Sequence, residues 1–372
     1  MKIGFDAKRL FNNFTGLGNH SRTTIDILTE FYPDNEYLLY TPKINRNGIT
    51  GPYLEKEACK TILPNGLVKG GIWRTFGLSK AVQKEYVQVF HGLSNEIPVG
   101  LKIPSVVTIH DVAFKTFPGM YHATDRFTYN IKWRYACSKA DRIIAISEST
   151  KKDIIRFYNV APHRIDVIYQ PVNGIYYTHD NGICPVSLEQ QVKDNPFMLY
   201  VGSINSRKNL LGIVKAIELL PKESRIPLVV IGDGRGYKQT VLDYIAEHKL
   251  NHLIVFTSEK VGTLGLRYLY SKARMLVYPS FYEGFGLPIV EAMLSNCPVI
   301  TSNISSLPEA AGPDSLYVDP ANPADIADKI KALLDNDALH LSVTEKGYRF
   351  AIEKFNPQTL ARQLVEVYGR LI

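Results

Sequence analysis

The sequence predicts an α/β protein made of two doubly wound domains, each a parallel β-sheet with helices on both faces. Its 372 residues are typical of two domains rather than one. Short apolar runs, as expected for buried parallel strands, alternate with helical patterns along the chain. In addition, Lys2–Asp6 and Phe197–Gly202 begin alike, because each apolar run is followed by a polar loop and then a helical pattern.

The order of these elements divides the chain into two domains. Helical patterns follow the first run through Thr23, Ile27 and Leu28, and the second through Leu210, Ile213, Val214 and Ile217. The stretch 171–195 breaks the alternation, so we expect a linker there, between domains at 1–170 and 196–355. Ligands of such sheets bind beyond the carboxyl ends of the strands, and the cleft between two domains is the natural site. The further strands are predicted at Val87–Phe90, Ser105–Ile109, Arg142–Ile146, Pro227–Ile231, Met275–Tyr278 and Pro298–Thr301.

Charge, cysteine content and hydropathy indicate the kind of partner and the cellular compartment to expect. The 43 basic and 36 acidic residues give a net charge of +7, which suits anionic partners but is too small to indicate nucleic-acid binding. The four cysteines are far apart and form no CxxC pair, so we expect a reducing compartment and no zinc site. The opening residues resemble no signal peptide, and no apolar run reaches about 18 residues. A cytoplasmic protein is expected.

The segment EGFGLPIVE, from Glu283 to Glu291, is the most informative in the chain. Pro288 suits the first turn of a helix, which places Glu283 in the preceding loop and Glu291 in the first helical turn. Gly284 and Gly286 allow a ligand to approach the backbone. A helix N-terminus attracts anions, and a carboxylate can accept two neighbouring hydroxyls. The segment therefore predicts a site for a phosphorylated, hydroxylated ligand, against the alternative of an ordinary glycine-rich turn.

Two other loops carry candidate binding residues. Arg207 and Lys208 stand in the loop Ser203–Asn209 before a helix, where they can neutralise a diphosphate. The alternative is a solvated basic loop. His110 follows the predicted strand SVVTI, and a neutral imidazole there can donate to a sugar hydroxyl. A structural histidine is the alternative, and it is the commoner case for a lone histidine.

Other motifs argue against cofactors and metals. The pair Gly16 and Gly18 lacks the third glycine and the later acidic residue of a dinucleotide fingerprint, which argues against nicotinamide and flavin. Asp335–Asn336–Asp337 follows a helical run and is read as a polar turn, so no metal site is expected. Gly232–Asp233–Gly234 is read as a tight turn first and a ligand contact second.

The basic, aromatic segment Lys69–Lys84 has two interpretations. The favoured interpretation is an amphipathic helix that packs on its own domain through Trp73, Phe76, Leu78 and Val82. The alternative is peripheral contact with an anionic membrane.

Together these segments resemble the retaining glycosyltransferases of family 4, which have the GT-B fold. The resemblance covers most of the chain. Its motifs, in the family's order, are TGLGNHSR, VVTIHDVAF, ADRIIAISEST, VGSINSRKN, IGDG, YPSFYEGFGLPIVEAM and CPVITSNISSLPEAAG. Each is weak alone, but seven in order are specific. The family's valine after LPE is Ala310 here.

The resemblance implies the site residues and their roles. Catalytic positions would be His110, facing the donor sugar, Arg207 and Lys208, on the leaving diphosphate, and Glu283, near the donor sugar. The resemblance also implies that domain 1–170 lies on the acceptor side and that domain 196–355 binds the nucleotide sugar. The final helix, within 356–372, would return to the N-terminal domain. Donor-binding positions would be Gly16 and Gly18 by the phosphates, Phe285, Gly286 and Leu287 by the sugar and phosphate, Glu291 on the ribose, and Ser258 and Val261 on the base.

The resemblance further implies an enzyme of polysaccharide biosynthesis that moves a sugar from a nucleotide sugar to a glycan or lipid-linked glycan. It needs no cofactor and no metal where Arg207 and Lys208 stabilise the leaving diphosphate. The run TSNISSLPEAAG is most similar to relatives that use GDP-mannose. Two alternatives stay open, a sugar-nucleotide epimerase of the same fold and a non-catalytic nucleotide-sugar-binding protein. An epimerase would act on the donor alone.

Overall fold

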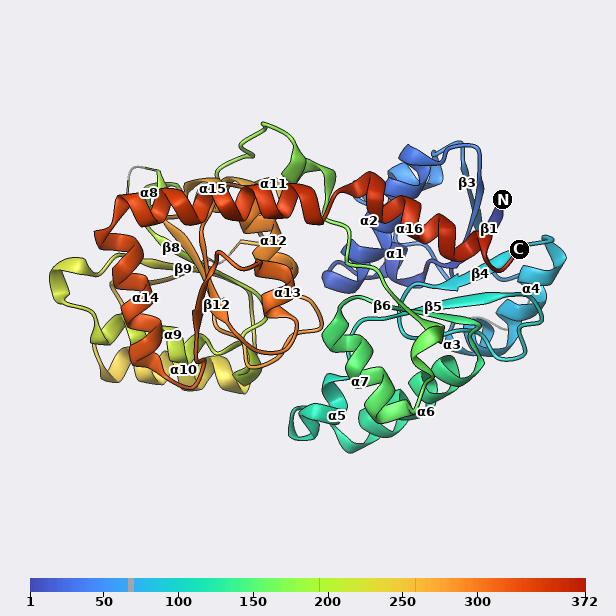
Figure 1. The fold of residues 1–372 in the computed structure, drawn as a ribbon, viewed down its shortest axis with the longest axis horizontal. Coiled ribbons are helices and arrows are strands. Elements are labelled where there is room, and N and C mark those ends of the chain that lie inside the picture. The colour runs from blue at the N-terminus through green and yellow to red at the C-terminus, as the bar shows by residue number, and fades with distance from the viewer. Residues whose placement is uncertain (66–69, 194, 258) are drawn as a thin grey trace. The chain divides into compact units, whose positions relative to one another are not determined.

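The computed structural model describes residues 1–65, 70–193, 195–257 and 259–372. The chain forms two compact units, one of Met1–Pro171 with Phe355–Ile372 and the other of Val172–Lys354. Each unit is built on one parallel sheet flanked by helices (Figure 1). The predicted fold class of two doubly wound α/β units is therefore confirmed.

The first unit has seven strands in the order β3-β2-β1-β4-β5-β6-β7, so the strand order reverses between β1 and β4. The strands are β1 (Lys2–Asp6), β2 (Glu36–Tyr40), β3 (Cys59–Ile62), β4 (Val89–Gly92), β5 (Ser105–Ile109), β6 (Arg142–Ala145) and β7 (Ile165–Val167). The helices are α1 (Lys8–Asn12), α2 (Gly16–Phe31), α3 (Gly70–Ile72), α4 (Leu78–Lys84), α5 (Ala113–Thr116), α6 (Ala123–Lys139), α7 (Glu148–Tyr158) and α16 (Pro357–Gly369).

The second unit has six strands in the order β10-β9-β8-β11-β12-β13, which reverses between β8 and β11. The strands are β8 (Met198–Val201), β9 (Leu228–Ile231), β10 (Ile254–Phe256), β11 (Met275–Tyr278), β12 (Val299–Ser302) and β13 (Leu316–Val318). The helices are α8 (Glu189–Val192), α9 (Leu210–Leu219), α10 (Gly236–Glu247), α11 (Thr263–Lys272), α12 (Leu287–Leu294), α13 (Leu307–Ala311), α14 (Pro323–Asp335) and α15 (Asp337–Lys354).

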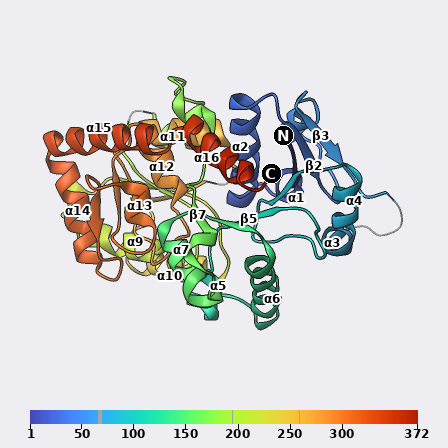
Figure 2. The same ribbon diagram turned by 45° about the vertical axis from the view of Figure 1, so that its right-hand side comes forward.

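The C-terminal helix α16 belongs to the first unit, where it runs beside α2 (Figure 2). The Asn356 side chain caps it by accepting the Thr359 N–H at 3.0 Å. Its apolar face, with Leu360 and Leu364, is buried in the same core cluster as Ile25 and Leu28 of α2. This pattern explains why the last residues of the chain return to the unit that contains the first ones.

The predicted linker 171–195 is mostly part of the second unit rather than a free connection. Tyr176 is buried, and its ring centroid lies 6.1 Å from that of Tyr270. Gly182 has φ +76°, and a Cβ there would lie 2.1 Å from the carbonyl oxygen of Leu264. Side-chain packing therefore helps to hold the described residues of this segment against the second unit.

The segment predicted as one amphipathic helix over 69–84 is helical but uneven. It comprises α3, a π-helical turn at Trp73–Gly77, and α4, while Lys69 lies outside the described residues. Trp73, Leu78 and Val82 pack into a core cluster of the first unit, as expected, but Phe76 is exposed. Within the described parts of the chain, no helix has the length and apolar character needed to cross a membrane.

Candidate active site

The loop that carries Arg207 and Lys208 begins at the carboxyl end of β8, at the reversal of strand order. The two cations stand in a short 3₁₀ turn, Ser206–Lys208, whose preceding Asn205 accepts the Lys208 N–H at 3.1 Å. Asn209 adopts a left-handed conformation, and its amide donates to the carbonyl oxygens of Pro279 and Pro320 at 3.1 and 2.7 Å. These bonds tie the cationic loop to the end of β11.

The Gly232–Asp233–Gly234 turn supports that loop from the neighbouring strand β9. A Cβ at Gly232 would lie 1.9 Å from the carbonyl oxygen of Gly202, and one at Gly234 would lie 2.0 Å from that of Ile204. Asp233 is exposed and pairs with Lys238 at 2.8 Å. The turn therefore has a structural role in the described chain, which is the interpretation that the sequence favoured.

Glu283 joins the two cations in one buried cluster at the ends of β8 and β11. Its carboxylate lies 2.6 Å from Lys208 Nζ and 3.0 Å from Arg207 Nη1. The Tyr278 hydroxyl donates to the same carboxylate at 3.1 Å, and Lys208 Nζ also bonds that hydroxyl. Two cations against one carboxylate leave the cluster with a net charge of +1, which suits an anionic ligand.

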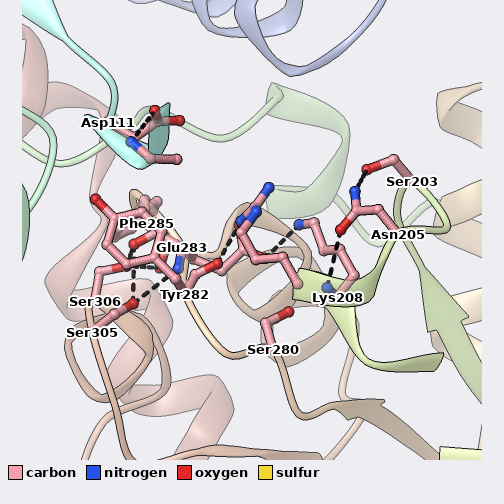
Figure 3. A network of polar contacts seen from close by, with 12 residues as sticks. Asp111, Ser203, Asn205, Lys208, Ser280, Tyr282, Glu283, Phe285, Ser305 and Ser306 are labelled. Carbon is pink, nitrogen blue, oxygen red and sulfur yellow. Dashed lines mark hydrogen bonds and ion pairs between the residues drawn. The ribbon is translucent and has the colours of Figure 1, made fainter. Parts of the chain in front are cut away.

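The backbone around Glu283 is fixed by two serines of the loop after β12 (Figure 3). Ser305 Oγ exchanges bonds of 2.9 and 3.0 Å with the N–H and carbonyl oxygen of Glu283. Ser306 Oγ lies 2.8 Å from the same carbonyl oxygen and 2.9 Å from that of Phe285. Arg207 bonds the Tyr282 carbonyl oxygen. These bonds hold the backbone of the segment in one conformation.

Electrostatics keep Glu283 ionised although it is only 7% exposed. Burial by itself would raise the pKa of this carboxyl, but Lys208 and then Arg207 outweigh burial and hold the pKa below its ordinary value of 4.5. The site thus holds an ionised carboxylate between two basic side chains at neutral pH.

Glu291 lies in a different electrostatic setting. It stands in the second turn of α12, and not in the first as the sequence predicted, because the helix begins at Leu287 with Gly286 as its N-cap. Burial raises the pKa of Glu291 to about 8, although a 3.2 Å hydrogen bond from the Tyr270 hydroxyl opposes that shift. A carboxyl group with this pKa can both donate and accept hydrogen bonds near neutral pH.

Phe285, Gly286 and Leu287 form the entry to α12. Phe285 is buried, and Gly286 has φ +113°, which favours glycine. Their backbone stands where the first N–H groups of a helix attract anions.

The predicted base-contacting segment is only partly visible. Ser258 lies outside the described residues. Val261 is half-buried just before α11, and a Cβ at Gly265 would lie 2.8 Å from its side chain. Nearby, Thr257 bonds Ser187 at 2.9 Å. The assignment of this segment to the base stays a prediction.

His110 lies in the first unit, directly after β5, and is buried. Its Nε2 is 2.9 Å from the carbonyl oxygen of Leu93, and its Nδ1 is 3.0 Å from the amide nitrogen of Gln170. Because an amide nitrogen donates, Nδ1 accepts and Nε2 carries the proton. Burial lowers the pKa of His110, which favours this neutral form. Both ring nitrogens are engaged here, so donation to a sugar would require exchanging the bond to Leu93.

Gly16 and Gly18 open helix α2 in the same unit. The Asn13 side chain accepts the N–H groups of Thr15 and Gly18, both at 3.0 Å. A Cβ at Gly18 would lie 1.8 Å from the Asn13 carbonyl oxygen, so this position requires glycine. A Cβ at Gly16 would meet no described atom within 4 Å, so packing does not explain that glycine.

The structure thus brings Arg207, Lys208 and Glu283 into contact, places Glu291 in the adjoining helix, and leaves His110 in the other unit. Tyr278 and Tyr270, which hydrogen-bond the two glutamates, were not predicted as site residues. Tyr278 ends a predicted strand and is the first residue of the motif YPSFYEGFGLPIVEAM, which was the available signal. Among the described residues, no three His, Cys, Asp or Glu side chains gather as a metal site would require.

Comparison with known proteins identifies the family. The model of glycosyl transferases group 1 matches residues 188–350, and that of glycosyltransferase family 4 matches residues 27–173. The O-antigen chain mannosyltransferase B of Escherichia coli is 34% identical over 292 residues, 77% of this chain and 75% of that protein. The O-antigen chain mannosyltransferase RfbU of Salmonella typhimurium is 30% identical over 58% of this chain and 56% of its own.

Solved structures give the same fold at low sequence identity. HepE of Anabaena, solved with UDP and glucose, has a TM-score of 0.74 and 17% identity over 99% of both chains. WaaG, a glycosyltransferase involved in lipopolysaccharide biosynthesis, has a TM-score of 0.69 and 16% identity over 99% of both chains. The matched motifs, the full-length fold and the 34% identical relative lead to one conclusion: the chain belongs to the family 4 glycosyltransferases (glycosyl transferases group 1), which have the GT-B fold.

Proposed function

We propose that this enzyme transfers mannose from GDP-mannose to a glycan acceptor, with retention of configuration at the anomeric carbon and without a metal or cofactor. The observation that carries the proposal is the cluster of Arg207, Lys208 and Glu283. Its net positive charge stands at the carboxyl ends of β8 and β11, where doubly wound sheets bind nucleotides.

The relatives support the choice of sugar. Several of the proteins similar to this chain are named as mannosyltransferases. They include the MMP alpha-(1->4)-mannosyltransferase of Mycolicibacterium hassiacum, 39% identical over 62% of this chain and 54% of its own. Two of them are named for the O-antigen chain, which supports a glycan acceptor. HepE was solved with UDP, so a uridine donor is the competitor to test.

The chemistry follows from where charge develops. As the bond from the anomeric carbon to the diphosphate oxygen breaks, negative charge builds on the diphosphate. Arg207 and Lys208 are already placed to stabilise this charge, and they need no reorganisation in the transition state. The acceptor hydroxyl then bonds to the anomeric carbon on the face that the diphosphate leaves, and its proton passes to a diphosphate oxygen. Retention follows without a carboxylate nucleophile.

The two glutamates take different parts in this proposal. Glu283, ionised between the cations, accepts hydroxyls of the donor sugar when the diphosphate replaces it as partner of Arg207 and Lys208. Glu291, with its raised pKa, binds the ribose by accepting from one hydroxyl and donating to or accepting from the next.

A donor screen tests the proposal. Thermal unfolding is measured with GDP, UDP and ADP, because a ligand at 100 times its Kd stabilises a protein by roughly 2.7 kcal/mol. We expect GDP to give the largest shift. If UDP gave the largest shift, the donor would be a UDP-sugar and not GDP-mannose. No shift with any of the three nucleotides would refute the proposal.

The reaction is then followed by NMR with GDP-mannose, with and without methyl α-mannoside as acceptor. We expect α-linked product only in the presence of the acceptor. A β-linked product would refute retention. Conversion of the donor sugar without any acceptor would instead indicate the epimerase that the sequence left open.

A further inference from the structure

A buried tyrosine hydroxyl stands inside the Glu283 cluster. Tyr278 is the last residue of β11 and is fully buried. Its hydroxyl donates to Glu283 Oε1 at 3.1 Å and accepts from Lys208 Nζ. The same Oε1 lies 2.6 Å from that Nζ. The hydroxyl, the carboxylate oxygen and the ammonium therefore form a triangle in which each atom bonds the other two.

Arg207 is held by other atoms than those of this triangle. Its guanidinium lies 3.0 Å from the second carboxylate oxygen of Glu283, Oε2, and bonds the carbonyl oxygen of Tyr282. The two cations of the cluster are thus held differently, Lys208 by Oε1 and the tyrosine hydroxyl, and Arg207 by Oε2 and a backbone carbonyl. A change that removes only the hydroxyl should therefore disturb Lys208 first.

The backbone on both sides of the contact between Tyr278 and Lys208 is fixed. Thr301 of β12 pairs with Tyr278 in the sheet, and its hydroxyl donates to the Tyr278 carbonyl oxygen at 2.9 Å. Asn209, next to Lys208, donates to the carbonyl oxygen of Pro279, next to Tyr278, at 3.1 Å. A lysine ammonium is carried on a flexible four-carbon stem, whereas the phenol is rigid. The hydroxyl therefore gives a mobile charge a fixed partner.

The hydroxyl keeps its proton at neutral pH. Burial, and then the charge of Glu283, raise the pKa of Tyr278 well above its ordinary value of 10. A neutral hydroxyl has one donor and two acceptor lone pairs, so it can bond a carboxylate and an ammonium at once. It can also orient Lys208 without cancelling its charge, which a carboxylate cannot do. The charge of Lys208 then stays available to an anionic ligand.

We propose that Tyr278 is a positioning residue of the transfer reaction. Its hydroxyl holds Lys208 Nζ at the leaving diphosphate while Glu283 turns to the hydroxyls of the donor sugar. The inference rests on the proposed function, from which it takes the diphosphate and the part of Glu283. It adds the group that keeps Lys208 in place once Glu283 has released it.

The test removes the hydroxyl alone. Tyr278→Phe keeps the ring, and Glu283 keeps Lys208 and Arg207 as partners, so the variant should fold, which urea unfolding verifies. A hydrogen bond to a charged group accounts for roughly a ten- to hundredfold difference. We expect kcat at saturating donor to fall at least about tenfold and KM for the donor to change less than about threefold, because charge develops on the diphosphate only in the transition state.

Tyr244→Phe is the matched control. The Tyr244 hydroxyl on α10 also donates to a carboxylate, that of Glu218 on α9, at 2.5 Å. Both residues belong to the same unit as Tyr278 but not to the Glu283 cluster. We expect kcat to be unchanged in this control. A normal kcat in Tyr278→Phe, or an equal loss in both variants, would overturn the proposal.

A double-mutant cycle separates the positioning of Lys208 from a general packing effect. If Tyr278 acts through Lys208, Tyr278→Phe should change kcat less than about twofold in the Lys208→Ala background. It should keep its full effect in the Arg207→Ala background, because Arg207 lies outside the triangle. Equal losses in the two backgrounds would overturn the proposal, since a packing defect does not depend on which cation is present.

Binding of the product gives a readout that does not need turnover. GDP carries the full charge of the leaving group, whereas GMP lacks the second phosphate. We expect Tyr278→Phe to lower the ratio of GDP affinity to GMP affinity at least about tenfold, measured by calorimetry. UDP and UMP take their place if the donor screen selects uridine. An unchanged ratio would mean that the hydroxyl does not hold Lys208 at the diphosphate.

The proposed function fails separately. If the wild-type chain transfers sugar from no donor, but Tyr278→Phe lowers the ratio of the two affinities, the place of Tyr278 beside the diphosphate stands and the transfer reaction does not. If Tyr278→Phe transfers sugar as fast as the wild type, the reaction stands and the part of Tyr278 in it does not.

Discussion

Lys208→Ala should slow sugar transfer far more than it destabilises the fold. Lys208 Nζ lies 2.6 Å from the carboxylate of Glu283 and, with Arg207, makes up the positive charge of the cluster. Loss of one preplaced donor at a developing anion costs on the order of 100-fold in turnover, or about 2.7 kcal/mol. We therefore expect a decrease of about that size in kcat at saturating donor.

The effect on stability should be smaller. A buried carboxylate left without any partner costs roughly 3–5 kcal/mol, but Glu283 keeps Arg207 at 3.0 Å and the Tyr278 hydroxyl at 3.1 Å. We therefore expect a loss of about 1–3 kcal/mol in the free energy of unfolding, measured by urea denaturation. Lys238→Ala is the control, because Lys238 pairs at 2.8 Å with the exposed Asp233 in the same unit.

That loss should depend on pH. In the wild type the pKa of Glu283 is held below its ordinary 4.5, so its carboxylate stabilises the folded chain above that value. The contribution disappears as pH falls through the folded-state pKa. Removing Lys208 brings the pKa of Glu283 closer to its ordinary value. The difference in the free energy of unfolding between variant and wild type should therefore be largest near pH 7 and shrink in acid. Near-normal kcat in Lys208→Ala, or equal losses in Lys208→Ala and Lys238→Ala, would refute the role of the cluster.

Three further predictions concern Glu291, the turn after β9 and the metal requirement of the reaction. Glu291→Ala should weaken nucleotide binding, measured by calorimetry, because it removes both oxygens that would bond the ribose. In the wild type, Glu291 keeps its proton in the folded chain up to a pKa of about 8 but loses it near pH 4.5 in the unfolded chain. The free energy of unfolding therefore falls between pH 4.5 and 8, by at most about 1.4 kcal/mol per pH unit. The variant should not show this decline. Gly232→Ala should lower the urea midpoint by more than Gly236→Ala, because only the first Cβ meets a carbonyl oxygen, at 1.9 Å. Transfer should persist in excess EDTA, and its abolition with rescue by magnesium would contradict the proposed electrostatics.

The sequence predicted the central strands well and the peripheral ones poorly. β1, β5 and β11 are apolar runs at least four residues long, and each was found with its bounds. β7, β10 and β13 have three residues each, too few for a period to be recognised. The stretch 171–195 was read as a linker because its composition is that of loops. Its packing depends on Tyr176 meeting Tyr270, a contact between distant segments that no local pattern indicates.

In the candidate site, too, local motifs were predicted correctly and contacts between distant segments were not. Arg207, Lys208 and Glu283 were predicted from motifs next to strand ends, and the structure brings them together. The position of Glu291 in the helix was wrong by one residue, since Pro288 is the second helical residue and not the first, and this moves Glu291 from the first turn into the second. For His110 the position after β5 was right. Its partners Leu93 and Gln170 come from two other loops, so the sequence could not reveal that both ring nitrogens are engaged.

Strand order explains why the cluster of the second unit was predicted and the charge network around Arg74 in the first unit was not. In the second unit, the strands on either side of the reversal, β8 and β11, are each followed by a recognisable motif. In the first unit, the strands at the reversal are β1 and β4. Arg74, which bonds the carboxylates beyond these two strands, lies in a separate helical turn and follows neither strand in the sequence. Asp6 was a visible charge at a strand end, but Glu96, the second carboxylate that Arg74 bonds, is expected near it only when β4 is known to lie beside β1. Charged residues at strand ends therefore predict a site best when the strand order is known, because the order decides which strand ends are neighbours.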